Sequence, residues 1–331
     1  MKVPICLIID DPAPVVSVWY AHSRTGLTPD GRPIPPRYPN SYLMDFCDVI
    51  EKRGIKGKFS LVPMPGNYGD IVNGIEGVSD EELNEWLDTV KERVAPRFSI
   101  APELLTHNKA VDLETNEALP MRENEWVATQ DRTTLTPYIS KALSLLKEAG
   151  FDCCGVNSPW TTGWEVIDEY AAAISQAIYD VYGKKNAWYY LHNKRNTPNV
   201  KPWIDYEEDG RTLVSIPATT FDETWKTLEN ARDDDEFINE LADNLITKDG
   251  KSGDLIKVIE TGGYPVILTH WQAMYSNGAY TGLKIIDEVA KRVNEHLLDK
   301  VEWMTAEEIM EMVLKNKDEY RVSFRMEYKK A

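Results

Sequence analysis

Side chains that can bind a metal ion or transfer a proton recur directly after the apolar runs of this sequence. Two adjacent carboxylates, Asp10 and Asp11, end the first run, and His270 ends the seventh. The loop after the third run carries Glu103, His107 and Asp112. Each residue alone also fits a structural role, because Asp is common in turns and a buried His normally finds a hydrogen-bond partner. Together they indicate a functional site.

Polar and aromatic side chains lie beside these candidates. Asn157 and Trp160 follow the fourth run, and Trp271 comes directly after His270. The flat faces of Trp rings can stack on sugar rings, although the same side chains also fill protein cores. We expect Asn157, Trp160 and Trp271 to bind the substrate, the two Trp rings by contact with a carbohydrate. Trp271 should also shield His270 from water.

The elements that position these residues are read from hydrophobic patterning. Short, continuously apolar runs indicate strands buried on both faces, which is typical of a parallel sheet flanked by helices. We predict such strands at 3–9, 57–63, 97–104, 151–156, 187–191, 212–217, 265–270 and 300–304. Amphipathic patterns and capping boxes predict helices at 79–96, 136–150, 164–183, 236–246, 283–298 and 305–314.

This alternation predicts an α/β fold, a mostly parallel (β/α) barrel of seven or eight strands, formed by residues 1–331 as one domain. A doubly wound open sheet is the alternative. In a barrel the carboxyl ends of the strands open at one end, here called the mouth, where active sites collect. Strands ending at Asp11, near Glu103 and at His270 should therefore point to one mouth.

Composition limits the partners and the compartment. The net charge of -17 argues against a nucleic acid or an anionic membrane as the main partner and leaves a carbohydrate or another small molecule. The start MKVPICLIIDD is not a secretory signal and no run is long enough to span a membrane, so a cytoplasmic protein is expected, with export open if a signal was trimmed. The spacing of the four cysteines favours buried, reduced thiols.

The succession IIDDP, KGKFSLVP, THNKAVD, NSPW and ILTH resembles the polysaccharide deacetylase family, the NodB-like domain of the glycoside hydrolase/deacetylase superfamily. The resemblance spans the chain from Val3 to the final VEWMTAEEI, and the order of the motifs carries it. It implies a distorted barrel of seven or eight strands and a metal-dependent hydrolase that removes an N- or O-acetyl group from a carbohydrate.

The resemblance also implies roles for individual residues. Asp10 would be the general base, Asp11 a metal ligand and His107 the first histidine ligand. The family's second histidine falls on Val111, and Asp112 is the nearest replacement as third ligand.

Two further motifs of the family carry over in part. Pro159 and Trp160 match its third motif, but the arginine that orients the base is absent, so Asn157 is a candidate for that task. His270 would be the general acid, and the negative charge of Asp10 or Asp11 would raise its pKa. A divalent ion is expected, with Zn first and Mn, Co or Fe as alternatives, because these ions accept mixed nitrogen and oxygen ligands.

Two other functions remain open. A metal-independent glycosidase could pair Asp10 or Asp11 with Glu103, Glu125 or Asp112, because such enzymes need two carboxyl groups facing one bond. A catalytically silent carbohydrate-binding protein of the same fold is the other alternative. Metal content and turnover distinguish the three functions.

Overall fold

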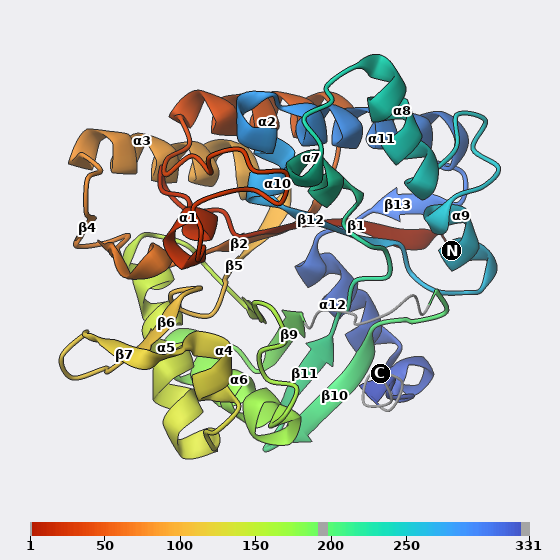
Figure 1. The fold of residues 1–331 in the computed structure, drawn as a ribbon. Coiled ribbons are helices and arrows are strands. Elements are labelled where there is room, and N and C mark those ends of the chain that lie inside the picture. The colour runs from red at the N-terminus through yellow and green to blue at the C-terminus, as the bar shows by residue number, and fades with distance from the viewer. Residues whose placement is uncertain (1, 191–197, 326–331) are drawn as a thin grey trace.

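The central sheet is built around the first strand. The computed structural model describes residues 2–190 and 198–325 (Figure 1). Strand β1 (Val3–Asp10) lies between β2 (Gly57–Leu61) and β12 (Val266–His270), all parallel, and β2 continues to β5 (Phe98–Pro102). The amino-terminal half of β1 also pairs with β13 (Val301–Trp303). The carboxyl ends of these strands therefore share one edge.

A second sheet forms the other side of the barrel. Its order is β10 (Trp203–Glu208), β11 (Arg211–Ser215), β9 (Asn186–Tyr190) and β8 (Gly155–Asn157), with only β10 antiparallel. A parallel bridge from Glu103 to Asn157 joins β8 to the first sheet, and Thr219 N donates to Val266 O on the other side. Regular strand pairing does not continue across either junction. The predicted distorted barrel is therefore confirmed, but its sheets are not closed.

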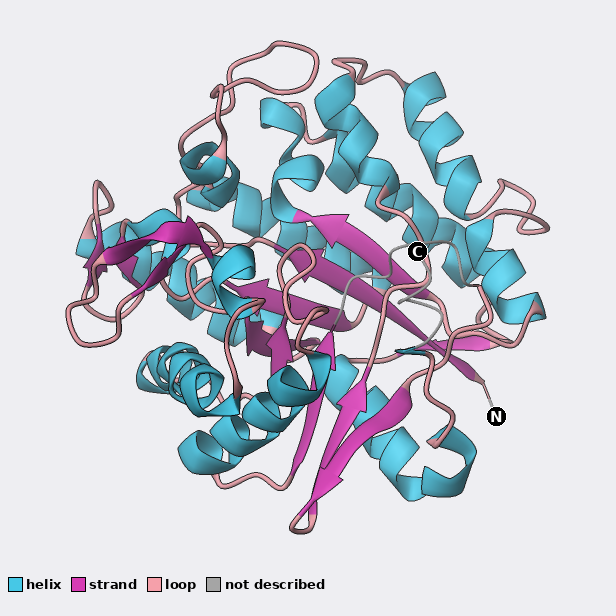
Figure 2. Ribbon diagram, turned by 60° about the horizontal axis from the view of Figure 1, so that its bottom comes forward, coloured by secondary structure: helices cyan, strands magenta, loops and turns pink. Residues whose placement is uncertain are grey.

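Helices surround the strands (Figure 2). One group lies on the outside of the first sheet, and α12 packs against the barrel interior. The longer helices are α2 (Asn40–Arg53), α3 (Asp80–Thr89), α5 (Arg132–Glu148), α6 (Ile167–Tyr182), α8 (Asp235–Leu245), α9 (Asp254–Glu260), α11 (Thr281–His296) and α12 (Ala306–Lys315). The shorter elements are α1 (Val18–His22), α4 (Glu123–Val127), α7 (Lys226–Glu229), α10 (Trp271–Tyr275), β3 (Gly69–Asp70), β4 (Gly74–Ile75), β6 (Lys109–Val111) and β7 (Ala118–Arg122).

The alternation of side chains along β1 decides what enters the barrel. Ile5, Leu7 and Ile9 pack in the outer core against the helices, whereas Cys6 and Ile8 pack in the inner core with α12. Successive side chains of a strand point to opposite faces, so the next inward residue after Ile8 is Asp10. Burial on both faces explains the continuous apolar run.

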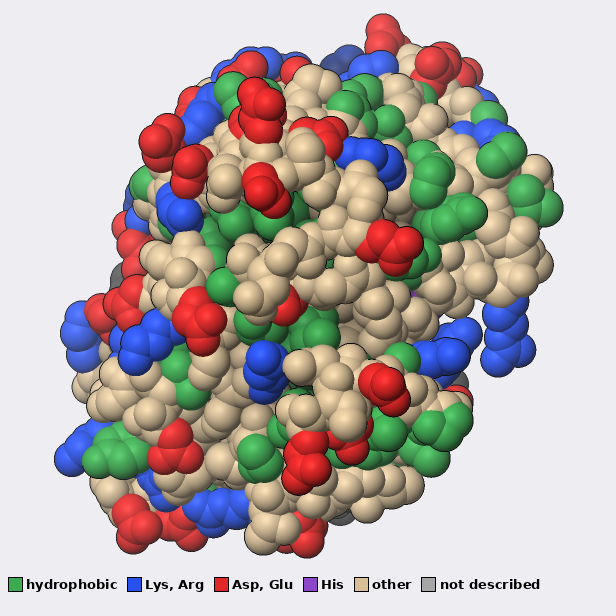
Figure 3. Space-filling view, turned by 90° about the vertical axis from the view of Figure 1, so that its left-hand side faces the viewer, with side chains coloured by type: hydrophobic (Ala, Val, Ile, Leu, Met, Phe, Trp, Pro, Cys, Tyr) green, Lys and Arg blue, Asp and Glu red, His purple; other side chains and the backbone are tan. Residues whose placement is uncertain are grey.

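Helix α2 was not predicted, and no side chain caps its start. It begins after Pro39, which makes no capping hydrogen bond, and ends at Gly54 in the left-handed region (φ 66°). The four cysteines are buried and free, as expected. Among the described helices none is both long and apolar enough to cross a membrane. Acidic and basic side chains are interspersed on the face shown in Figure 3.

Candidate active site

Four strands deliver polar side chains to the mouth of the barrel. In the register of β1 and β12, Asp10 lies opposite His270. Glu103 follows β5 and bridges to Asn157 at the end of β8. The backbone N–H of Asp11 donates to Glu103 Oε2 at 2.6 Å. The prediction that these strand ends meet at one mouth is confirmed.

A cluster of three buried donor groups lies at this mouth. His107 Nε2 is 2.7 Å from Asp11 Oδ1 and 3.6 Å from Glu103 Oε1. The candidate ligand atoms all lie within 4.8 Å of one another. His107 Nε2 is the partner of Asp11 Oδ1, whereas Glu103 Oε1 receives no hydrogen bond from the described residues. Two carboxylate oxygens and an imidazole nitrogen so close together require a positive charge between them, so the residues fit a divalent ion.

The close approach of Asp11, Glu103 and His107 shifts the pKa values of all three groups. Burial acts to raise the pKa of Asp11, but the charge of His107 and a hydrogen bond from Gln272 hold it below its ordinary value. Burial raises the pKa of Glu103 well above its usual range, and the charges of Asp11 and Asp10 add to this effect. Burial acts to lower the pKa of His107, yet Asp11 raises it overall. A metal ion would replace these shared protons.

The expectation that Asp112 completes the cluster needs correction. Its Oδ1 accepts hydrogen bonds from the backbone N–H groups of Glu114 and Thr115, both at 2.9 Å, in the turn between β6 and β7. Glu103 stands in its place beside His107. An Asp followed by a short polar segment commonly caps a turn in this way. Glu103 lies four residues before His107 at a strand end, which was the available signal.

Asp10 is held by a lysine that sequence reasoning missed. Lys58 Nζ lies 2.5 Å from Asp10 Oδ1 and also donates to Asn157 Oδ1. All three side chains are buried. Lys58 points inward because it alternates with the outward residue Phe59 along β2. A lysine within the buried strand KGKFSLVP was the signal, since a buried charge is normally paired. Asn157 supports Lys58, and its predicted contact with substrate stays a prediction.

His270 pairs with a carboxylate other than the two expected. Its Nδ1 lies 2.7 Å from Asp222 Oδ2, and Asp222 is nearly buried. Burial acts to lower the pKa of His270, but the hydrogen bond and charge of Asp222 raise it to about 9, with smaller effects from Asp11 and Asp10. The segment after β11 runs beside β12 and brings Asp222 to the mouth.

The two tryptophans proposed for substrate binding lie in different environments. Trp271 is 1% exposed and packs against Tyr42, Phe46 and Phe59, so it does not line the mouth. His270 and Trp271 are adjacent at the end of an extended strand, and when the first faces inward the second faces the helices. Trp160 is half-buried and meets the ring of His107 edge-on, with centroids 4.2 Å apart.

A second histidine of the site comes from α1. The ring of His22 stacks on that of His107 with centroids 5.2 Å apart. Burial and the charge of His107 lower the pKa of His22 to about 3. No motif in the sequence around His22 singles it out. His192, a further candidate from its position after the fifth strand, lies outside the described residues.

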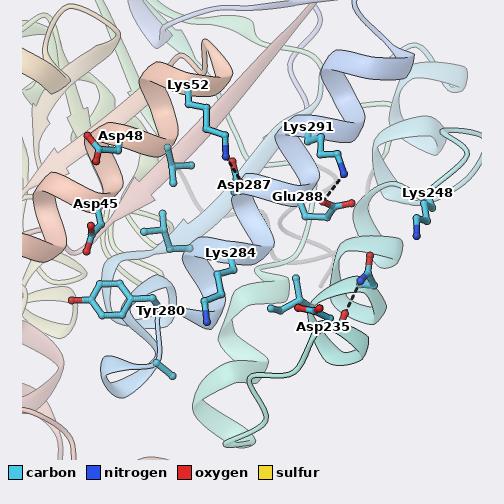
Figure 4. A pocket seen from close by; sticks show the side chains of 15 residues that line it. Asp45, Asp48, Lys52, Asp235, Lys248, Tyr280, Lys284, Asp287, Glu288 and Lys291 are labelled. Carbon is cyan, nitrogen blue, oxygen red and sulfur yellow. Dashed lines mark hydrogen bonds and ion pairs between the residues drawn. The ribbon is translucent and has the colours of Figure 1, made fainter.

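A groove of about 820 Å³ lies elsewhere, between α2, α8 and α11 (Figure 4). It is lined by acidic and basic side chains that partly pair with one another, such as Lys52 with Asp287 and Lys291 with Glu288, both at 3.3 Å. None of the residues of the mouth lines it. The groove is separate from the candidate active site.

Comparison with known proteins supports the fold. No protein-family model matches the chain, and no curated protein matches it in sequence. A structure from Mycobacterium smegmatis, described as a candidate polysaccharide deacetylase, is similar with a TM-score of 0.50 and 15% identity over 84% of this chain and 79% of that chain. The Xyl-CE4 domain of a multidomain xylanase from the hindgut metagenome of Trinervitermes trinervoides aligns with a TM-score of 0.40 and 11% identity over 98% and 96%. The first likeness confirms the predicted deacetylase resemblance at the level of the fold.

Proposed function

We propose that this chain is a metal-dependent hydrolase that removes an N- or O-acetyl group from a carbohydrate. The observation that carries the proposal is the convergence, at one mouth, of the Asp11, Glu103 and His107 cluster with Asp10 and His270. A nucleophile, a base and an acid can then act on one acyl group. The deacetylase-like fold supports the carbohydrate as substrate.

Asp11, Glu103 and His107 would hold a divalent ion, with Zn the first candidate and Mn, Co or Fe the alternatives. Such an ion lowers the pKa of water and polarises a carbonyl group. Gln272 donates to Asp11 Oδ2 at 2.5 Å, which orients this carboxylate and leaves Oδ1 toward His107. The protein thus fixes the direction of its ligand oxygens before any ion binds.

Asp10 would accept the proton of the attacking water. It lies next to Asp11 in the chain and faces the barrel interior. Lys58 contacts Oδ1 and fixes the carboxylate in one orientation, the task expected of the absent arginine. Because the pair is buried, it is less exposed to competition from solvent than a surface ion pair.

His270 would protonate the leaving group. Its Nδ1 is engaged by Asp222, so proton transfer to the substrate falls to Nε2. The carboxylate of Asp222 stabilises the imidazolium form and fixes the ring, as an acid of this kind requires. Trp225 meets the His270 ring edge-on at 5.1 Å and limits its motion further.

The test compares metal content with acetate release. Protein purified without added metal, its chelator-treated form and the Asp11→Ala variant are assayed on N-acetylglucosamine oligomers and O-acetylated xylose oligomers. We expect about one ion per chain, loss of acetate release after chelation, recovery with Zn or Mn, and neither metal nor activity in Asp11→Ala. Full activity in metal-free protein would exclude the proposal, and cleavage of glycosidic bonds would favour the glycosidase. Sugar binding without turnover would favour a silent binding protein.

A further inference from the structure

The loop that carries His107 has an unfavourable backbone. Leu104 and His107 adopt φ values of 42° and 52°, in the left-handed region that residues with side chains rarely adopt. Such conformations persist only where surrounding contacts hold them. His107 Nδ1 has no hydrogen-bond partner among the described residues, although metal-bound histidines usually have one. The position of His107 must therefore be fixed by other contacts.

The carboxylate of Glu123 supplies these contacts. It accepts hydrogen bonds from three consecutive backbone N–H groups, those of Leu105 at 3.2 Å, Thr106 at 2.9 Å and His107 at 3.0 Å. The hydroxyl of Tyr138 donates to it as a fourth partner at 2.8 Å. Glu123 is 0% exposed, and no Lys or Arg forms an ion pair with it in the described chain. The hydrogen-bond donors to its carboxylate are the three loop amides and the Tyr138 hydroxyl.

Burial of a carboxylate without a cation is costly, and an apolar side chain could fill the same space. The hydrogen bonds of Glu123 go to the backbone that sets the direction of His107. We propose that Glu123 is a positioning residue, which holds His107 at the cluster through the backbone of residues 105–107. This inference rests on the proposed metal-binding role of His107.

The first experiment measures metal affinity. In Glu123→Gln one carboxylate oxygen becomes an NH₂ group that faces backbone donors, so at least one loop amide loses its acceptor. Chelator-treated protein is titrated with Co²⁺ alone. We expect the Kd to rise by about 10- to 100-fold, the usual range when a group that supports a metal ligand is removed.

The matched control is Asp205→Asn. The side chain of Asp205 is 1% exposed and accepts hydrogen bonds from Trp203 Nε1 at 2.6 Å and from Arg325, and none of the mouth residues contacts it. Both variants lose a buried carboxylate and should lower the Tm. Only Glu123→Gln should weaken Co²⁺ binding, which separates positioning from general destabilisation.

A second measurement does not need a metal. Amide hydrogen exchange at residues 105–107 in metal-free protein should be faster in Glu123→Gln than in the wild type and in Asp205→Asn. A folded Glu123→Gln protein with the wild-type Co²⁺ Kd and unchanged exchange would overturn the inference. If the wild type itself binds no Co²⁺, the proposed function fails, and the exchange result alone then decides whether Glu123 anchors the loop.

Discussion

At the scale of single residues, the mouth is organised by pairs of opposite charge. Lys58 with Asp10 and Asp222 with His270 each join a group proposed for chemistry to a buried partner from another strand or segment. Breaking a buried pair on one side leaves an uncompensated charge and is costly. The two partners, Lys58 and Asp222, should therefore matter nearly as much as the groups they hold.

His270→Ala should abolish acetate release while leaving the fold and metal content intact. In the wild type the pKa of about 9 keeps His270 protonated at neutral pH, so the rate should fall as pH rises through about 9. Asp222→Asn removes the partner that raises this pKa, and the alkaline limb should move to lower pH. The measurements are kcat/KM against pH and the Tm of each variant.

The result for His270→Ala separates two roles. A histidine of purely structural value would give a lower Tm with nearly normal turnover. The ion pair of His270 with Asp222 also makes the stability depend on pH. Because the pKa of His270 in the folded protein lies above its ordinary value, the stabilisation by the pair is complete below about pH 6.5 and is lost as the pH rises through about 9. Unchanged turnover in the variant would remove His270 from the mechanism.

At the scale of elements, α10 places Trp271 in the protein core, whereas the loop after β8 places Trp160 beside the mouth. Trp271 begins α10 and fills the outer core between the first sheet and α2. Trp160 lies in the loop after β8, with a positive φ of 50° and its ring against His107. Their neighbours, and not their residue type, decide which one can meet a substrate.

Trp271→Ala should destabilise the protein by about 3–5 kcal/mol, because a large buried ring leaves a cavity in a packed core. Trp160→Ala should change stability much less and should raise KM for the sugar substrate. Urea unfolding measures the first effect and steady-state kinetics measures the second. Equal stability loss in the two variants would contradict this assignment.

At the scale of the whole molecule, the cluster draws ligands from distant parts of the chain. Glu103 and Asp11 are 92 residues apart and belong to strands separated by β2. An ion held by both strand ends, as proposed, would bind the folded chain and not the unfolded one, so it would stabilise the fold by mass action. The net charge of -17 also raises the local concentration of divalent cations, an effect that salt weakens.

Chelation should therefore lower the Tm, and added Zn²⁺ or Mn²⁺ should restore it in a concentration-dependent way. At 100 times Kd the expected gain is about 2.7 kcal/mol in unfolding free energy. The control is Asp11→Asn, in which the Tm should no longer respond to metal. A Tm of the wild type that stays constant up to millimolar metal would argue against a site in the folded protein.

The sequence by itself determined the parallel strands, most long helices and the strand ends at which polar residues emerge, whereas the antiparallel strand β10 and the short strands β3, β4, β6 and β7 were not predicted. These features are local, because a continuous apolar run and a capping box such as Ser79 with Glu82 each involve only a few consecutive residues. They were enough to predict the mouth, with Asp11, His107 and His270 as candidates.

Only the tertiary structure decided the partners of those candidates. The contact of Asp222 with His270 and that of Lys58 with Asp10 each join residues that are 48 positions apart in the sequence. The pairing of β5 with β2 and the bridge to β8 place Glu103, and not Asp112, beside the cluster. The spacing of residues in the sequence does not predict such contacts. They arise when strand register and the alternation of side chains bring separate segments to the same point in space.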